Sequence, residues 1–269
     1  MPAVILAVLD HPEAAPALLN AANCLADLVG GGQVEALIAR TPPITTILPS
    51  EEVLTKRQED RIRAREAARA AALTEAFHRC AQGLSTPARL IDIEALATQF
   101  LAKQGPGADY IVIARPNHDE HRTAWNVIHT ALFQTDRPVL VVPPGAARSF
   151  GRRIALAWRN DERTIRAALS LMHCLRRLEC LLVLAGHRDG APAPQLPAVV
   201  VEHQVRAELH ILPIGPHVFG EALLARAHEL GADMIALGAY VHDPLHRLIL
   251  GGVTDYMLDH ADLPLLMRH

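Results

Sequence analysis

A glycine-rich segment near the C-terminus has the residue types of an anion-binding loop. It starts at Gly238, at the end of an apolar run, and closes on the Gly-Gly-Val-Thr stretch Gly251–Thr254. Glycine lets a backbone approach a ligand closely, and the free N–H groups of a helix start point at an anion. The segment therefore predicts a phosphate site, although glycines at a strand end and a helix start are also ordinary turn residues.

Histidines in and around this segment suggest a second chemistry. His242 and His246 flank Asp243, and residues 118–121 carry a similar group. A metal site needs ligands that converge and are oriented by further partners. Loop histidines at these spacings more often face solvent, so we expect no metal and expect His242 to contact a phosphate.

Bulk composition limits the partners. The chain has 269 residues, a formal net charge of −3 and a pI near 6.6, which favours neither nucleic acid nor an acidic membrane as partner. No 18 consecutive residues are apolar, and the N-terminus lacks the basic start of a signal peptide. The four cysteines form no CxxC pair and fit buried thiols. We expect a cytoplasmic protein without a membrane segment.

The chain repeats itself once. Val4–Asp10 resembles Ile154–Asn160, and Gly107–Asp119 resembles Gly231–Asp243, with six of thirteen positions identical in the second pair. The matches occur in the same order in both halves, which indicates a tandem duplication. A Pro-Pro-Gly stretch at 143–145 predicts the linker, so we expect domains at residues 1–144 and 150–269.

Each half alternates apolar runs with helical patterns, which predicts parallel sheets covered on both faces. The expected strands are Val4–Leu9, Val34–Ala39, Arg89–Asp92, Asp109–Ala114, Pro138–Val142, Arg153–Trp158, Cys180–Ala185, Arg206–Leu212, Asp233–Leu237 and Leu263–Met267. The expected helices are Pro12–Leu28, Glu51–Gln82, Ile93–Gln104, Thr123–Gln134, Glu162–Arg177, Gln195–Gln204, Phe219–Leu230 and Gly252–His260. Ligands bind beyond the carboxyl ends of such strands.

These residues resemble the universal stress protein family. Its nucleotide loop reads Gly-x-x-Gly, then nine residues, then Gly-[Ser/Thr]; Gly238 and Gly251 match the outer glycines, with 242–250 as the nine between them. The run Gly231–Gly238 and the ending Asp262–Leu266 are similar to that family as well. The resemblance covers nearly the whole chain, once per half, and is closest to the tandem bacterial type.

The resemblance implies two flavodoxin-like (adenine nucleotide alpha-hydrolase-like) α/β domains, each a five-stranded parallel sheet of order 3-2-1-4-5 with helices on both faces. It implies that the domains pair through their fifth strands, around Val139–Val142 and Leu265–Met267. It also implies that the C-terminal domain binds ATP or another adenine nucleotide. The implied nucleotide-binding residues are Trp158, Asn160 and Ala185 around base and sugar, and Gly238, Ala239, His242, Gly251, Gly252, Val253 and Thr254 around the phosphates.

The C-terminal half departs from the family pattern at three positions. Val241 replaces the second glycine and narrows the loop, because a β-branched residue resists positive φ. Gly252 stands at the Ser/Thr position, with Thr254 two residues later. Asn160 replaces the acid that usually follows the first strand, and Trp158 before it could be either a core residue or a pocket wall.

The N-terminal half has lost more of the pattern. Ala114 and Asn117 replace its first two loop glycines, although Asp10 keeps the acid after the first strand. We therefore expect this half to have lost its nucleotide site.

Together these features predict a tandem universal stress protein, a stress-response factor that binds a nucleotide in its C-terminal domain. The alternative is an adaptor that binds no nucleotide and acts through dimerisation, as a homodimer, or by docking a protein client. The long helix predicted over Glu51–Gln82 alternates acids and bases, which fits a solvated face better than a docking surface. No motif places a general base or a magnesium-binding acid, so we expect at most slow ATP hydrolysis.

Overall fold

The structure, a computed structural model, describes residues 2–46, 54–116, 121–146, 149–215, 219–239 and 252–269. Contacts divide the chain into two compact units. Unit 1 comprises Met1–Ala26 and Gly31–Arg137, and unit 2 comprises Asp27–Gly30 and Pro138–His269. Both units are α/β, as predicted. The contact division falls at Arg137, so the domain bounds 1–144 and 150–269 stay a prediction.

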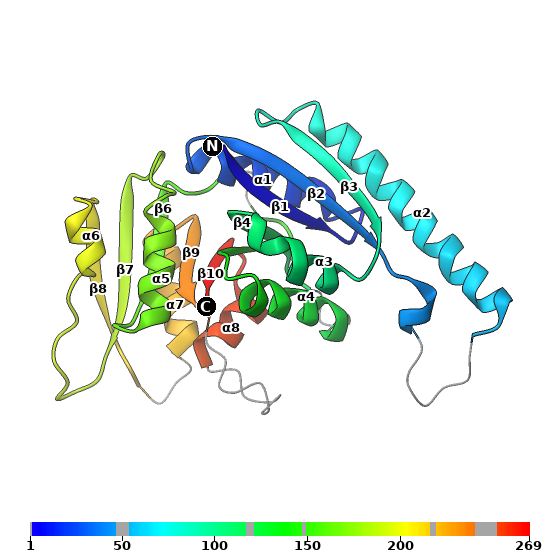
Figure 1. The fold of residues 1–269 in the computed structure, drawn as a ribbon. Coiled ribbons are helices and arrows are strands. Elements are labelled where there is room, and N and C mark those ends of the chain that lie inside the picture. The colour runs from blue at the N-terminus through cyan, green and yellow to red at the C-terminus, as the bar shows by residue number, and fades with distance from the viewer. Residues whose placement is uncertain (1, 47–53, 117–120, 147–148, 216–218, 240–251) are drawn as a thin grey trace. The chain divides into compact units, whose positions relative to one another are not determined.

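Unit 1 alternates strands and helices from its first strand onward (Figure 1). Its elements are β1 (Ala3–Leu9), α1 (Ala15–Leu28, whose end groups with unit 2), β2 (Gly32–Arg40), the 3₁₀ turn η1 (Pro43–Thr46), α2 (Lys56–Ala81), β3 (Ala88–Glu94), α3 (Ala97–Gln104), the 3₁₀ turn η2 (Gly105–Gly107), β4 (Tyr110–Ala114) and α4 (His121–Gln134).

The strands of unit 1 form a parallel sheet in the order β3-β2-β1-β4. Ile5 pairs with Val34 of β2 and Tyr110 of β4, so β1 lies in the centre. Its run Ile5–Leu9 is buried, as expected for a strand covered on both faces. Since crossovers between parallel strands are right-handed, α1 and α2 cover one face and α3 and α4, which contact each other, cover the opposite face.

Unit 2 repeats this alternation, with helices that are shorter except for α7, which is longer than α3. Its elements are β5 (Val139–Val142), β6 (Arg153–Trp158), α5 (Glu162–Leu171), β7 (Cys180–His187), α6 (Ala198–Glu202), β8 (Ala207–Pro213), α7 (Phe219–Glu229), β9 (Met234–Gly238), α8 (Gly252–His260) and β10 (Leu265–Arg268).

Five strands of unit 2 run parallel in the order β8-β7-β6-β9-β10, which confirms the predicted order 3-2-1-4-5. A sixth strand joins them. β5 pairs antiparallel with β10, with Leu140 opposite Leu266. The predicted pairing of the two fifth strands is therefore observed, and it places β5 inside unit 2 by contacts. All four residues of β5 are buried, because neighbours cover both of its faces.

Helix boundaries differ from the sequence prediction where side chains cap the ends. α2 begins at Lys56 because Thr55 and Gln58 form a capping box, in which each side chain bonds the other residue's backbone N–H. α5 ends at Leu171 rather than Arg177. The shortened α6 is only five residues long, since its Val199-Val-Val201 run has a low helix propensity.

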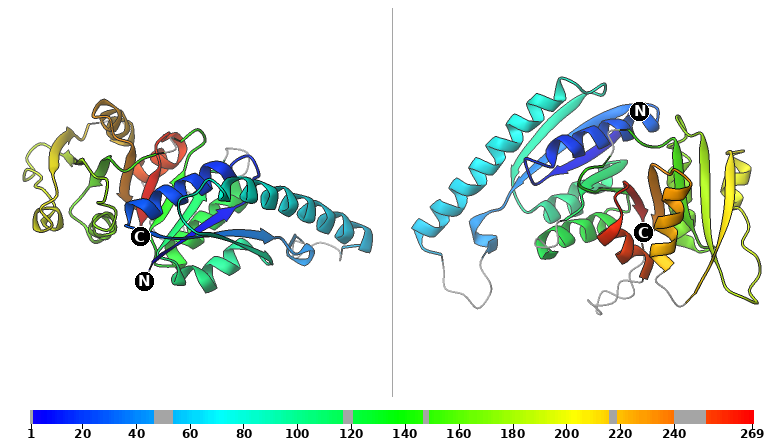
Figure 2. Two further views of the ribbon diagram at one scale, coloured as in Figure 1. Left: turned by 90° about the horizontal axis from the view of Figure 1, so that it is seen from above. Right: turned by 180° about the vertical axis from the view of Figure 1, so that it is seen from behind.

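Helix α2 is unevenly buried along its length. Its buried residues are Ala70, Leu73, Ala76 and Phe77, all in the second half, and the residues from Lys56 to Arg69 include none that is buried. Figures 1 and 2 show the first half of the helix extending past the strands on which the second half packs. Apolar packing is therefore concentrated in the C-terminal half of α2.

The start of β2 gives a stability test. A Cβ on Gly32 would lie 2.5 Å from the backbone oxygen of Ala3 in the adjoining β1, and neither strand can yield without losing register. Gly32→Ala is therefore expected to lower the free energy of unfolding by about 1–3 kcal/mol, as overpacking does. Gly107→Ala is the control, because a Cβ there meets nothing within 4 Å. Equal urea midpoints for the two variants would contradict the clash.

Candidate functional site

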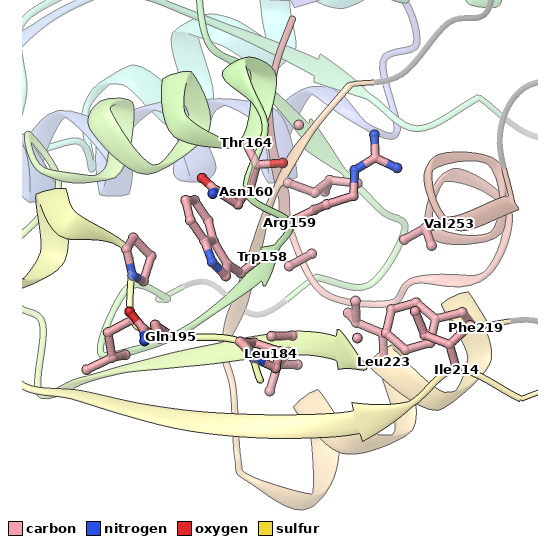
Figure 3. Close-up of a pocket in the computed structure, with 18 of the residues that line it drawn as sticks. Trp158, Arg159, Asn160, Thr164, Leu184, Gln195, Ile214, Phe219, Leu223 and Val253 are labelled. Atoms are coloured by element: carbon pink, nitrogen blue, oxygen red, sulfur yellow. The ribbon is translucent and has the colours of Figure 1, made fainter. Parts of the chain in front are cut away.

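A cavity of 840 Å³ opens in unit 2 beyond the carboxyl ends of β6, β7 and β9 (Figure 3). This is the edge at which parallel α/β sheets bind ligands. Its walls come from the end of β6, the segment Pro192–Ala198 before and into α6, the start of α7 and the first turn of α8. The volume falls in the range of small-molecule sites.

The end of β6 and the end of β7 provide one wall. Trp158 pairs in register with Ala185, and both line the cavity, Trp158 half-buried and Ala185 fully buried. Asn160 lines it too but is exposed. Figure 3 shows the indole of Trp158 on the same side of the cavity as Gln195. Three predicted residues, Trp158, Asn160 and Ala185, are thus brought together.

The first turn of α8 forms another part of the wall with Gly252, Val253 and Thr254. Thr254 is only 2% exposed, and its Oγ1 has no hydrogen-bond partner in the part of the chain that the structure describes. A buried hydroxyl without a partner costs free energy, so such atoms call for an explanation. The first N–H groups of a helix lack intrahelical acceptors as well.

Gly238 lines the cavity, and its lack of a side chain also matters for packing. A Cβ there would lie 3.0 Å from the backbone C of Arg163 and the backbone N of Thr164. A side chain on Gly238 would therefore crowd the backbone at the start of α5, and the role of Gly238 in binding a ligand stays a prediction. At Gly252, by contrast, a Cβ meets nothing within 4 Å.

Three further predicted positions do not line the cavity or lie outside the described residues. Ala239 is buried and absent from the wall, and its N–H donates to the backbone oxygen of Arg268 at 2.7 Å. His242 and Gly251 lie outside the described residues, as does Val241. Among the residues that are described, no cluster of three His, Cys, Asp or Glu side chains could hold a metal ion.

Arg159, which was not among the predicted site residues, lines the cavity, and Asp161 holds it from outside the wall. Asp161 caps α5, since its Oδ1 accepts the N–H of Thr164 at 3.0 Å and the Thr164 hydroxyl at 3.1 Å. Its other oxygen accepts from Nε of Arg159, which lines the cavity. An Asp directly before a predicted helix start is a capping signal, so the sequence did contain the clue.

The charge of the cavity wall is positive. Among the described residues that line it, Arg159 is the only charged side chain, and no carboxylate or histidine is present. Figure 3 shows the guanidinium of Arg159 on the side of the cavity toward Val253 at the start of α8. Arginine and a helix start are both suited to an anion.

The remaining wall is apolar. Leu184, Ile214, Phe219 and Leu223 line it, and Figure 3 shows Ile214, Phe219 and Leu223 grouped together. Gly186 also lines the cavity. A Cβ there would lie 2.8 Å from Cδ1 of Ile214 and 2.9 Å from Cζ of Phe219, so glycine lets these two side chains pack closely against β7. The cavity therefore joins an apolar and aromatic surface to a cationic rim.

Asp255 follows Thr254 in α8 and is half-buried. Burial, and in second place the nearby charge of Asp259, raise the pKa of Asp255 to about 6. Its Oδ1 is buried without a hydrogen-bond partner in the described part of the chain. A carboxyl that is held near neutrality in this way destabilises the folded state whenever it is ionised.

Comparison with known proteins agrees with this architecture. The family model "Usp: Universal stress protein family" matches residues 218–269, which hold α7 to β10 and the predicted loop. No curated protein matches the sequence.

Solved structures match along the whole chain. A universal stress protein from Archaeoglobus fulgidus DSM 4304 has a TM-score of 0.72 at 15% identity, over 98% of this chain and 95% of that one. A functionally unknown protein from Pseudomonas aeruginosa PAO1 has a TM-score of 0.60 at 16% identity, over 98% and 92%. A candidate universal stress protein from Pseudomonas aeruginosa UCBPP-PA14 has a TM-score of 0.59 at 15% identity, over 100% and 93%.

The resemblance to the universal stress protein family is thereby confirmed, by the family model in the C-terminal segment and by the fold along the whole chain. The layout is the tandem one, with one α/β unit after another. No helix in the described parts of the chain is long and apolar enough to cross a membrane. The cytoplasmic location stays a prediction.

Asp255 gives a pH-dependent stability test. Its folded pKa of about 6 lies above its ordinary value of 3.8, so the folded state binds the proton more tightly. The contribution of Asp255 to the free energy of unfolding therefore falls as pH rises from about 4 to 6.

Asp255→Asn is expected to stabilise the protein at pH 7 by about 1 kcal/mol, less than the full shift implies because solvent screens a half-exposed group. Urea unfolding of both proteins at pH 4, 5 and 7 measures the effect. A difference that does not grow with pH would show that burial of the charge is not its cause.

Proposed function

We propose that unit 2 binds an adenine nucleotide, ATP or a relative, in the cavity beyond β6, β7 and β9, and that the protein acts as a nucleotide-responsive stress factor. The observation that carries the proposal is the buried hydroxyl of Thr254 at the start of α8, which has no hydrogen-bond partner among the residues that the structure describes. A ligand oxygen at this place would satisfy it together with the free N–H groups of the first helical turn.

Electrostatics supports an anionic ligand. Among the described wall residues Arg159 is the only charged side chain, and its guanidinium could pair with a phosphate group. Asp161 holds Arg159 through an ion pair, which limits the rotamers of a long side chain before a ligand arrives.

The apolar part of the cavity supports a planar base. Trp158 has an aromatic face at the end of β6. Ala185, its neighbour on β7, has a small side chain that leaves room for a ring. Asn160 replaces the acid that the family pattern expects, and its amide can hydrogen-bond a sugar hydroxyl as donor or acceptor. Gln195 adds a second amide on the side of Trp158.

The same wall argues against fast hydrolysis. A phosphoryl-transfer site needs a metal-binding acid and a residue that orients the nucleophile, and none of the described wall residues is an acid or a histidine. Binding without efficient turnover is the function that this cavity suits best. Bound nucleotide would then change how the protein binds a partner.

Thr254→Val separates binding from stability. Valine has the shape of threonine without the hydroxyl, so removing an unpartnered buried O–H is expected to leave the free energy of unfolding unchanged or to raise it. Binding of ATP is expected to weaken about tenfold, the effect of one hydrogen bond to a charged group. Isothermal calorimetry with ATP and urea unfolding measure the two quantities.

Thr130→Val, at a buried threonine of α4 in unit 1, is the matched control and is expected to leave ATP binding unchanged. The native protein should also release nucleotide when it is purified without added ligand and denatured. No released nucleotide and no heat with millimolar ATP would refute the proposal. That result would favour the alternative, an adaptor that works through dimerisation or a protein client.

A further inference from the structure

We propose that unit 1 fills its own ligand-binding edge with a side chain, and that Arg69 of α2 is this internal occupant. Arg69 would then do for unit 1 what a bound ligand would do for unit 2, namely satisfy polar groups beyond the carboxyl ends of the strands. The proposal concerns unit 1 alone, so it stands or falls independently of nucleotide binding by unit 2.

The guanidinium of Arg69 bonds two strand ends at once. Its Nη1 donates to the backbone oxygen of Asp10 at 3.0 Å and to Oδ1 of the same residue at 3.1 Å. Its Nη2 donates to the backbone oxygen of Ala39 at 2.5 Å. Asp10 directly follows β1, and Ala39 is the next-to-last residue of β2. Arg69 therefore bridges the central strand and its neighbour.

This position is the one at which the fold leaves room for a ligand. Parallel α/β sheets bind ligands beyond the carboxyl ends of their strands. In unit 2 the cavity lies beyond β6 and β7, the first two strands of its five-stranded parallel sheet in chain order. In unit 1 the guanidinium lies beyond β1 and β2, the first two strands there. Asp10, the acid that the sequence pattern assigns to a nucleotide, is engaged by Arg69 instead.

Glu66, one turn earlier in α2, completes the network. Its Oε2 accepts from Nη2 of Arg69 at 2.9 Å and from the backbone N–H of Thr41, just after β2, also at 2.9 Å. Burial alone would raise the pKa of Glu66, but the hydrogen bonds from Arg69 and Thr41 lower it below its ordinary value. The carboxylate is thus held ionised, and the Arg69 and Glu66 side chains are only 20% and 17% exposed.

The network explains how the first half of α2 is held. No residue from Lys56 to Arg69 is buried, so apolar packing contributes less to this half of the helix than to the other. Arginine suits the task because its planar fork presents five donors in fixed directions and stays charged at any pH of interest. A lysine could not reach the Asp10, Ala39 and Glu66 acceptors together.

Hydrogen–deuterium exchange of the full-length protein tests the proposal. Arg69→Ala is expected to speed exchange at least about tenfold in the N-terminal half of α2, because charge-assisted hydrogen bonds are lost. Glu66→Gln keeps the shape of the side chain and is expected to give a smaller change of the same kind. Arg69→Lys is expected to restore little of the protection, since it keeps the charge without the fork.

Arg79→Ala is the matched control. Arg79 lies in the same helix, is 71% exposed and pairs only loosely with Glu75 at 3.9 Å. Exchange in α2 should remain as in the native protein. If the exchange rates in the N-terminal half of α2 are the same in Arg69→Ala as in Arg79→Ala, Arg69 is an ordinary surface residue and the proposal is wrong. Should Arg69→Ala fail to fold, unchanged exchange in Glu66→Gln would overturn it equally.

Discussion

The carboxyl edge of a parallel sheet is a place where polar groups must find partners. Strand carbonyls end there and the following helices begin there with unpaired N–H groups. Side chains, water or a ligand must satisfy them, because an unpaired buried polar group costs about 1–3 kcal/mol. In both units the residues that carry chemistry gather at this edge.

The two units meet this requirement differently, although both come from one ancestral pattern. In unit 1, Arg69 and Glu66 reach in from a long helix and bond the ends of β1 and β2. In unit 2, the corresponding helix α6 has only five residues and contributes no such arm. Asp161 caps α5 and pairs with Arg159. The remaining space is a cavity, where the Thr254 hydroxyl has no partner among the described residues. The short helix of unit 2 thus accompanies an open cavity, whereas the long helix of unit 1 supplies side chains that bond the strand ends.

Most strands, the sheet order and the tandem layout could be predicted from the sequence, because buried parallel strands read as continuous apolar runs between helical patterns. Helix ends were predicted less well. Thr55 and Asp161 are N-caps, which the sequence marks only by their residue type. The periodic pattern of apolar residues continues past such a cap and does not show where the helix begins. Trp158, Asn160 and Ala185 all line the cavity, since strand ends in register converge at one edge. Ala239 does not line it, and its N–H donates to the backbone oxygen of Arg268.

The sequence by itself determined the duplication, the α/β class and the position of the glycine-rich segment, since each depends on residues close together in the chain. Only the tertiary structure decided what those residues do. A side chain on Gly238 would crowd the backbone of Arg163 and Thr164, which lie far from it in sequence. Asp10 is satisfied by an arginine 59 positions away, although the family pattern suggests a nucleotide for it. These contacts join residues that lie far apart in the sequence. A local sequence pattern cannot specify which side chain reaches which strand end.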